Sequence, residues 1–141
     1  MSARLAKLRA LSAEEWRLLL SATLLLALAE LGLRLFGFQR CRRWIGQRVR
    51  EGTAAEPDLA WATTAARMVA IAARYGPYRA SCLRQALVLW FLLGRRGIPA
   101  RLRIGATTGK DGFNAHAWIE LGERVLIGGD ERVRERYATL L

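Results

Sequence analysis

The fold of this chain is decided by one apolar stretch near its middle, which opens on a cysteine. It reads Ser81-Cys82-Leu83-Arg84-Gln85-Ala86-Leu87-Val88-Leu89-Trp90-Phe91-Leu92-Leu93. Serine is a favoured N-cap residue, so Ser81 predicts that a helix begins there with Cys82 in its first turn. The stretch carries no charge from Ala86 to Leu93, and Gly97-Ile98-Pro99 ends the pattern. We expect this helix to be the central buried helix of the domain.

A second long apolar segment lies towards the N-terminus. Ser12 and Glu15 have the spacing of a capping box, which predicts a helix over residues 16–36 that Gly37 ends. Its uncharged run, residues 18–29, is shorter than the about twenty residues of a membrane span. Glu30 and Arg34 would also be costly within lipid. The pattern therefore favours a helix buried against the domain or a partner, with membrane contact as the alternative.

Three further segments separate these helices. Residues 40–50 form a short basic amphipathic segment, in which Cys41 has no histidine or acid nearby in sequence and is interpreted as structural or incidental. Residues 51–57 resemble a linker. A helix from Leu59 to about Tyr75 follows, with one face expected to be buried. That face comprises Leu59, Ala62, Ala66, Val69, Ala70 and Ala73.

After residue 99 the apolar pattern changes to a period of two, which is typical of strands. Residues 100–106 alternate, residues 107–112 read as a polar turn or loop, and residues 114–121 alternate again. Gly122-Glu123 fits a two-residue hairpin turn into a third strand over residues 124–128. Helices first and an antiparallel meander last predict an α+β fold in a single domain over residues 1–141.

The only histidine, His116, lies on the second of these strands and shares a face with Trp118 and Glu120. If Leu121 pairs with Arg124, a uniform count places His116 opposite Gly129. A carboxylate that orients the imidazole should then come from residues 128–130, where Asp130 is the only acid. Glu120 is four residues along the strand, roughly 13 Å away, and is too distant to touch the ring.

A thiol at a helix N-terminus and an imidazole on a nearby strand are the parts of a cysteine nucleophile and its general base. The helix end favours a thiolate, and its N–H groups can hold an oxyanion. Taken singly, Cys82 could be a small buried hydrophobe, His116 a structural hydrogen-bonding residue and Asp130 a turn residue. The order of the elements along the chain favours the joint catalytic interpretation.

The composition argues against several other classes of protein. The net charge is +11, but the arginines are scattered, and no nucleic-acid motif is present. General basicity is the favoured interpretation, ahead of an acidic peptide partner or nucleic acid. Two cysteines are too few for a disulfide framework, and one histidine gives no zinc site. We expect a cytoplasmic protein with no metal or other cofactor.

The segment from residue 78 to residue 141 resembles the transglutaminase-like cysteine proteases, and most closely the standalone leader peptidases of lasso-peptide biosynthesis. The resemblance is carried by Ser81-Cys82-Leu83-Arg84-Gln85-Ala86, Leu93-Gly94-Arg95-Arg96-Gly97-Ile98-Pro99-Ala100, Arg103-Ile104-Gly105, Ala115-His116-Ala117-Trp118-Ile119-Glu120, Val125-Leu126-Ile127-Gly128-Gly129 and Arg136-Tyr137. It implies a helical N-terminal subregion over residues 1–55 and a transglutaminase/papain-like catalytic core over residues 56–141.

The resemblance also implies the roles of the site residues. Cys82 matches the nucleophile and His116 the base, whereas the family's acid falls near Gly128, which has no side chain to serve. Asp130 is two residues later, so a Cys-His dyad remains an alternative to a triad.

The implied reaction is removal of the leader from a ribosomally made precursor peptide. A separate leader-binding protein would assist, and an ATP-dependent cyclase would then act on the product. The apolar helix over residues 16–36 and the basic segment after it are candidates for docking that protein or the leader. Two alternatives are a non-catalytic basic module for nucleic acid or a membrane surface, and acyl transfer to an amine instead of water.

Overall fold

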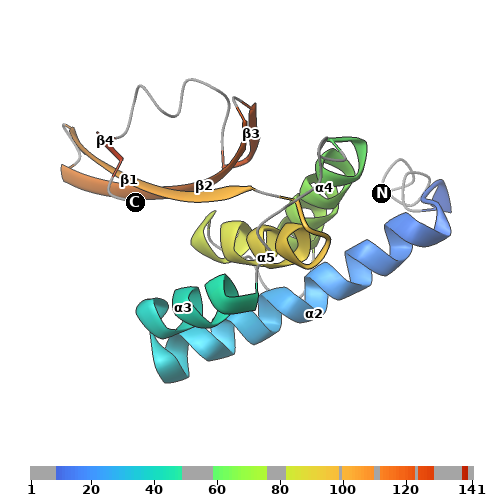
Figure 1. Ribbon diagram of the computed structural model, residues 1–141, viewed down its shortest axis with the longest axis horizontal. Coiled ribbons are helices and arrows are strands. Elements are labelled where there is room, and N and C mark those ends of the chain that lie inside the picture. Colours follow the sequence, from blue (N-terminus) through green and yellow to red (C-terminus); the bar gives the residue numbers. More distant parts are fainter. Residues whose placement is uncertain are drawn as a thin grey trace.

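A computed structural model of the chain describes residues 9–48, 59–75, 82–98, 100–109, 112–122, 124–128 and 138–139. The helices are α2 (Ala13–Phe36), α3 (Phe38–Arg48), α4 (Leu59–Tyr75) and α5 (Cys82–Arg95). The strands are β1 (Arg101–Gly109), β2 (Gly112–Leu121), β3 (Arg124–Ile127) and β4 (Ala138–Thr139). In Figure 1 the sheet forms one layer and the helices lie on one side of it. The α+β class expected from the sequence is confirmed.

Helix α5 is the centre of the packing, as expected. It contacts β1 and β2 on one side and α2, α3 and α4 on the others (Figure 1). Its fully buried residues include Leu87, Leu89 and Leu93. Gly97, with φ +77°, and Ile98 close the helix through hydrogen bonds from their N–H groups to carbonyls of the last turn.

The capping box predicted for α2 is present. The Ser12 hydroxyl accepts from the Glu15 N–H at 3.2 Å, and the Glu15 carboxylate accepts from the Ser12 N–H at 3.4 Å. Gly37, with φ +80°, ends the helix and donates its N–H to the Leu33 carbonyl. Only part of α2 is buried, however. Leu18, Leu19, Ala22 and Leu26 join the core, so the sequence interpretation of a buried helix holds for one face alone.

Helix α4 supplies an alanine-rich face to the core. Its buried residues are Ala62, Ala65, Ala66, Met68, Val69, Ala72 and Ala73. Small side chains allow the backbones of neighbouring helices to approach closely, and α4 packs against both α2 and α5. The expectation that Ala70 is buried is wrong. Val69 is buried, but Ala70 lies on the outer side of the helix and is exposed.

The sheet has four antiparallel strands in the order β3-β2-β1-β4. The expected loop over residues 107–112 is largely strand, because the β1–β2 ladder continues to the pair Gly109–Gly112. The two-residue edge strand β4, which pairs with β1, was not predicted from the sequence. The third strand ends at Ile127, one residue before its expected end.

The β2–β3 hairpin begins as predicted, with Leu121 paired to Arg124 and Gly122 at φ +61° in the turn. The register then shifts by one residue, since Glu120 pairs with Val125 but Ile119 pairs with Ile127. Leu126 is the extra residue of this β-bulge. The uniform count that placed His116 opposite Gly129 is therefore wrong for Ile119 and for the residues that precede it in β2.

Candidate functional site

Cys82 is the first residue of α5, where the sequence predicted it. It is half-buried, packs against the hydrophobic core and is a free thiol. Two residues later, Arg84 reaches Glu30 of α2 at 3.4 Å, which ties the first turn of α5 to α2. The first N–H groups of a helix have no partner within the helix, so they can stabilise negative charge beside Cys82. The predicted N-cap residue Ser81 lies outside the described residues.

His116 lies in β2, and its ring contacts the backbone of the residue that follows β3. The ring Nε2 is hydrogen-bonded to the carbonyl oxygen of Gly128. A carbonyl oxygen can only accept, so Nε2 carries the proton and Nδ1 is the nitrogen with the basic lone pair in the neutral ring. The contact therefore orients the single imidazole in the chain and favours the tautomer with the proton on Nε2.

Gly128 can make this contact because it has no side chain. Its φ is +94°, and a Cβ at this position would lie 2.5 Å from the Ala117 carbonyl oxygen and 2.8 Å from the Trp118 Cα. The backbone after β3 thus presses directly on β2 beside His116. The resemblance predicted an acid near this position, and in the structure the backbone carbonyl of Gly128 meets the imidazole.

A buried polar network continues from His116 along the same face of β2. The Trp118 ring stacks beside the His116 ring, with centroids 6.3 Å apart. Trp118 Nε1 donates to Glu120 at 2.9 Å, and Arg103 of β1 reaches the same carboxylate at 3.5 Å. Trp118 is fully buried and Glu120 is 8% exposed. The prediction that these three residues of β2 share a face is confirmed, and Glu120 has Trp118 and Arg103 as partners.

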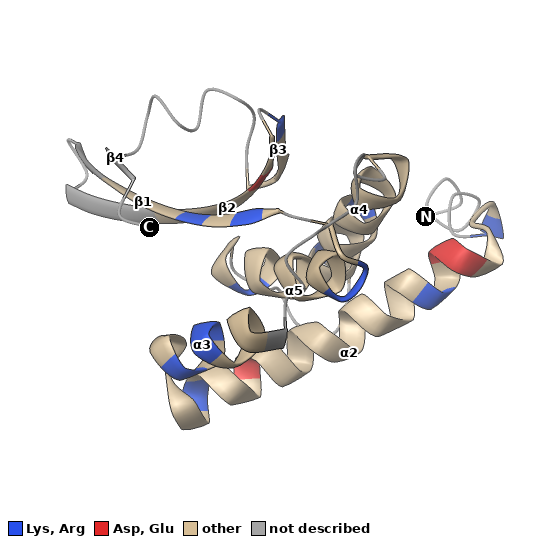
Figure 2. Ribbon diagram, in the orientation of Figure 1, with Lys and Arg blue, Asp and Glu red and all other residues tan. Residues whose placement is uncertain are grey.

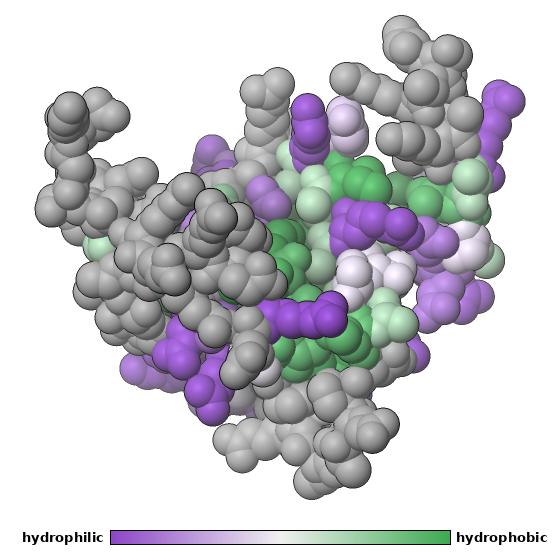
Figure 3. Space-filling model, turned by 90° about the horizontal axis from the view of Figure 1, so that it is seen from above, coloured by the Kyte–Doolittle hydropathy of each residue, from purple (hydrophilic) through white to green (hydrophobic). Residues whose placement is uncertain are grey.

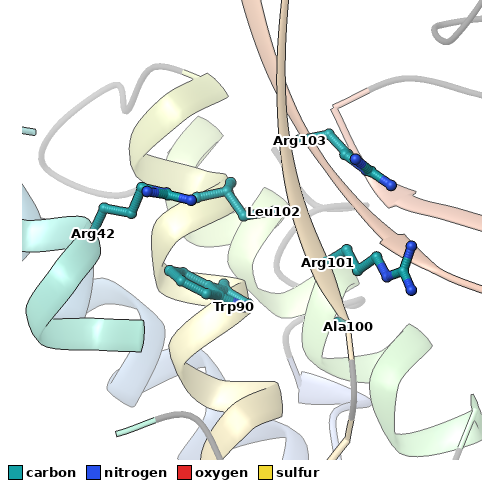
Figure 4. Close-up of a pocket in the computed structure, with 6 residues that line it drawn as sticks. All are labelled: Arg42, Trp90, Ala100, Arg101, Leu102 and Arg103. Carbon is teal, nitrogen blue, oxygen red and sulfur yellow. The ribbon is translucent and has the colours of Figure 1, made fainter. Parts of the chain in front are cut away.

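The opposite face of β2 packs on the helices. Ala117, Ile119 and Leu121 belong to the core that α2, α4 and α5 share. Paired residues of an antiparallel ladder point to the same side, and Leu102, the partner of Ile119, also joins this core. Figure 4 shows Leu102 pointing towards Trp90 of α5, while Arg101 and Arg103 point to the other side of β1.

It follows that Cys82 and His116 lie on adjacent packed elements but on different sides of β2. Helix α5 contacts β2 directly, yet the His116 ring is on the Trp118 face. Within the described residues no hydrogen bond joins the Cys82 thiol to the imidazole. The structure brings His116 together with Gly128, and it brings the helix of Cys82 onto the strand of His116. Asp130 lies outside the described residues, so its role stays a prediction.

A cavity of about 350 Å³ lies between α3, α5 and β1 and is lined in part by Arg42, Arg101 and Arg103. Figure 4 shows that the three guanidinium groups do not converge, because Arg42 points to the helical side of β1 and the other two point away from it. The cavity is therefore not a three-arginine anion site. No cluster of three metal-ligating side chains occurs among the residues that the structure describes.

The profile of the transglutaminase-like superfamily matches residues 24–141. The match begins within α2 and includes α3, α4, the Cys82 helix and the whole sheet. The chain therefore belongs to the transglutaminase-like superfamily, which includes cysteine peptidases. Neither the curated proteins nor the solved structures provide a match to the chain.

Proposed function

We propose that this protein is a cysteine peptidase that removes the leader from a ribosomally made precursor peptide during lasso-peptide maturation. The observation that carries the proposal is the placement of Cys82 as the first residue of a helix packed on the strand of the only histidine. Membership of the superfamily supports thiol chemistry at this position. The motifs around Cys82 and His116 support the leader-peptidase assignment.

In the proposed reaction the Cys82 thiol gives its proton to Nδ1 of His116, and the sulfur attacks the scissile carbonyl carbon. N–H groups at the start of α5 hold the oxyanion. Collapse breaks the C–N bond, the imidazolium gives its proton to the leaving amine, and a thioester remains. Water, deprotonated by His116, then releases the leader acid and restores the thiol. The Gly128 carbonyl holds Nε2–H throughout.

This mechanism requires the thiol and the imidazole to meet, and that requirement is the first part of the test. In the presence of precursor, iodoacetamide should alkylate Cys82 at mildly acidic pH in the parent protein, and His116→Ala should lose most of this reactivity. Cys41→Ser serves as the parent throughout, so that Cys82 is the only thiol. Equal labelling of the two proteins would show that no such pair operates.

The second part of the test is precursor cleavage, read by mass spectrometry with and without the separate leader-binding protein. Cys82→Ala and His116→Ala should each abolish cleavage and retain the fold by circular dichroism. A leader acid as product identifies hydrolysis, whereas a leader amide identifies transfer to an amine. We place this reaction in the cytoplasm, where ribosomal precursors arise.

A second candidate function follows from the separation of the two side chains across β2. A non-catalytic basic module would use the net charge of +11 to hold an anionic partner and would need no contact between Cys82 and His116. Its binding would weaken steeply with salt. A precursor left intact under all conditions would favour this candidate, whereas cleavage that survives Cys82→Ala would contradict the role proposed for Cys82.

A further inference from the structure

Helix α2 carries an apolar face that the domain does not cover. Five leucines point outward along it, each between 52% and 65% exposed: Leu20, Leu24, Leu28, Leu31 and Leu35. We call this set the leucine stripe. Its spacing of three and four residues places all five side chains on one side of the helix. Helix α2 is long and apolar enough to cross a membrane, and only 22% of its most apolar 18-residue segment is buried within the domain.

Aromatic side chains lie at both ends of the stripe. Trp16 is 37% exposed near the start of α2, and Phe36 and Trp44 are 59% and 51% exposed near its end. Phe36 and Trp44 also line an apolar groove of about 530 Å³ between α2, α3 and α5, together with Leu28 of the stripe. The uncovered apolar surface therefore continues from α2 onto α3.

The charges around this surface are positive. Helix α3 contains arginines and no acidic residue, and Figure 2 shows its blue bands without red. Arg40 borders the groove, and Arg43 lies one turn further along the exposed side of α3. Arg17 is exposed at the other end of the stripe. Within the described residues none of these three arginines makes an ion pair.

The acidic residues of α2 are held by the domain instead. Glu30 pairs with Arg34 at 3.0 Å and with Arg84 of α5 at 3.4 Å, and its side chain is 19% exposed. Glu14 and Glu15 are engaged by Trp61 and Arg67 of α4 at the start of the helix. On the face seen in Figure 3, by comparison, hydrophilic and hydrophobic residues lie interspersed among the described residues.

We propose that the leucine stripe and the α3 arginines bind the surface of an anionic membrane, with α2 lying in the plane of the headgroups. Leucines and aromatic rings enter the acyl boundary, and the arginines beside them meet the anionic headgroups. A continuous apolar surface bordered by cations is the combination that binds an anionic membrane surface.

The packing of α2 decides between lying on the membrane and spanning it. At 1.5 Å per residue, its 24 residues are about 36 Å long, which is enough to span. A span would have to remove Leu18, Leu19, Ala22 and Leu26 from the core and break the Glu30–Arg84 pair. Since one face of α2 is part of the fold, only its outer face is available to lipid.

The test is flotation of the untagged full-length protein with phosphatidylcholine vesicles that contain or lack phosphatidylglycerol. Binding should require phosphatidylglycerol and decrease with added salt. The exposed double variant Leu24→Ser/Leu28→Ser should weaken binding about tenfold or more, because two leucine side chains no longer leave water for the acyl boundary. Arg40→Gln/Arg43→Gln should weaken it several-fold, because two cations no longer face the anionic headgroups.

Matched controls separate this surface from general basicity. Tyr75→Ser removes a side chain 52% exposed on α4, and Arg101→Gln removes an exposed arginine on the far side of the sheet. Both should bind as the parent does. Absence of binding to anionic vesicles, or equal loss in the controls, overturns the proposal. The proposal is also overturned if the leucine variant still binds vesicles but no longer forms a dimer, as measured by light scattering. The same holds if it still binds vesicles but no longer forms a complex with the leader-binding protein. Precursor cleavage in vesicle-free solution tests the peptidase function separately.

Discussion

The imidazole of His116 is hydrogen-bonded through Nε2 to the backbone carbonyl of Gly128. A main-chain acceptor thus meets the ring beside the position where the family's acid is expected. A backbone carbonyl fixes the tautomer as a carboxylate would, but it carries no full negative charge to stabilise an imidazolium. The contact therefore orients the ring of His116, the residue proposed as the base.

The tautomer of His116 can be measured directly, because the chain contains one histidine. In untagged ¹⁵N-labelled protein, long-range ¹⁵N–¹H correlation spectra should show a single neutral imidazole with the proton on Nε2. Gly128 requires this form, since its oxygen can only accept. A proton on Nδ1, or rapid exchange between the two forms, would contradict the described contact.

Substitution of Gly128 should cost more stability than substitution of another glycine that also has a positive φ. Gly128→Ala meets the Ala117 carbonyl oxygen and the Trp118 Cα, whereas a Cβ at Gly97, where φ is +77°, would have nothing within 4 Å. We expect Gly97→Ala to lower the free energy of unfolding by about 1–2 kcal/mol. Gly128→Ala should lose about 1–3 kcal/mol more through the clash. Urea unfolding measures both, and equal losses would contradict the close approach.

Glu120 should matter more for stability than Glu14, although each accepts a hydrogen bond from a tryptophan Nε1. Glu120 accepts from Trp118 at 2.9 Å in a buried network that includes Arg103, and Glu14 accepts from Trp61 at 3.1 Å on the surface. Glu120→Ala should lower the free energy of unfolding by about 1–3 kcal/mol. Glu14→Ala should change it by less than about 1 kcal/mol. A reversed order in urea unfolding would refute the burial of this network.

The role of Asp130 can be decided by kinetics on the precursor. If Asp130 assists His116, Asp130→Ala should lower kcat/KM partially, by about 10–1000-fold, while Cys82→Ala abolishes cleavage. If Gly128 alone orients the ring, Asp130→Ala should leave kcat/KM within about twofold of the parent. The exposed variant Glu14→Ala is the control for general effects of removing an acid.

Much of the fold could be predicted from local sequence chemistry. Ser12 and Glu15 mark the start of α2, Gly37 its end, and Gly122 the β2–β3 turn, because these residues act through their own backbone or their nearest neighbours. The helix predicted from Leu59 to about Tyr75 is α4, for the same reason. The two-residue strand β4 could not be found this way, because it is too short to show alternation and depends on its pairing with β1.

The candidate site was predictable in its residue types and less so in its assembly. Cys82 at the head of α5 and His116 in the middle of β2 follow from capping and alternation. The β-bulge at Leu126 has no local signal, and it shifts by one residue the count that placed His116 opposite Gly129. A glycine at the end of a strand can mark a close backbone approach, but only the tertiary structure shows that Gly128 lies against Ala117 and Trp118 of β2.

The sequence by itself determined the type and order of the main helices and strands, and which residues could act as nucleophile and base. These properties arise from interactions between residues close in the chain. The tertiary structure decided which face of each element is covered. It turned His116 to the Trp118 side of β2, brought the Gly128 carbonyl to its ring and left the leucine stripe of α2 outside the core. Such choices depend on how distant segments pack, because an apolar side chain can be buried only where another element covers it.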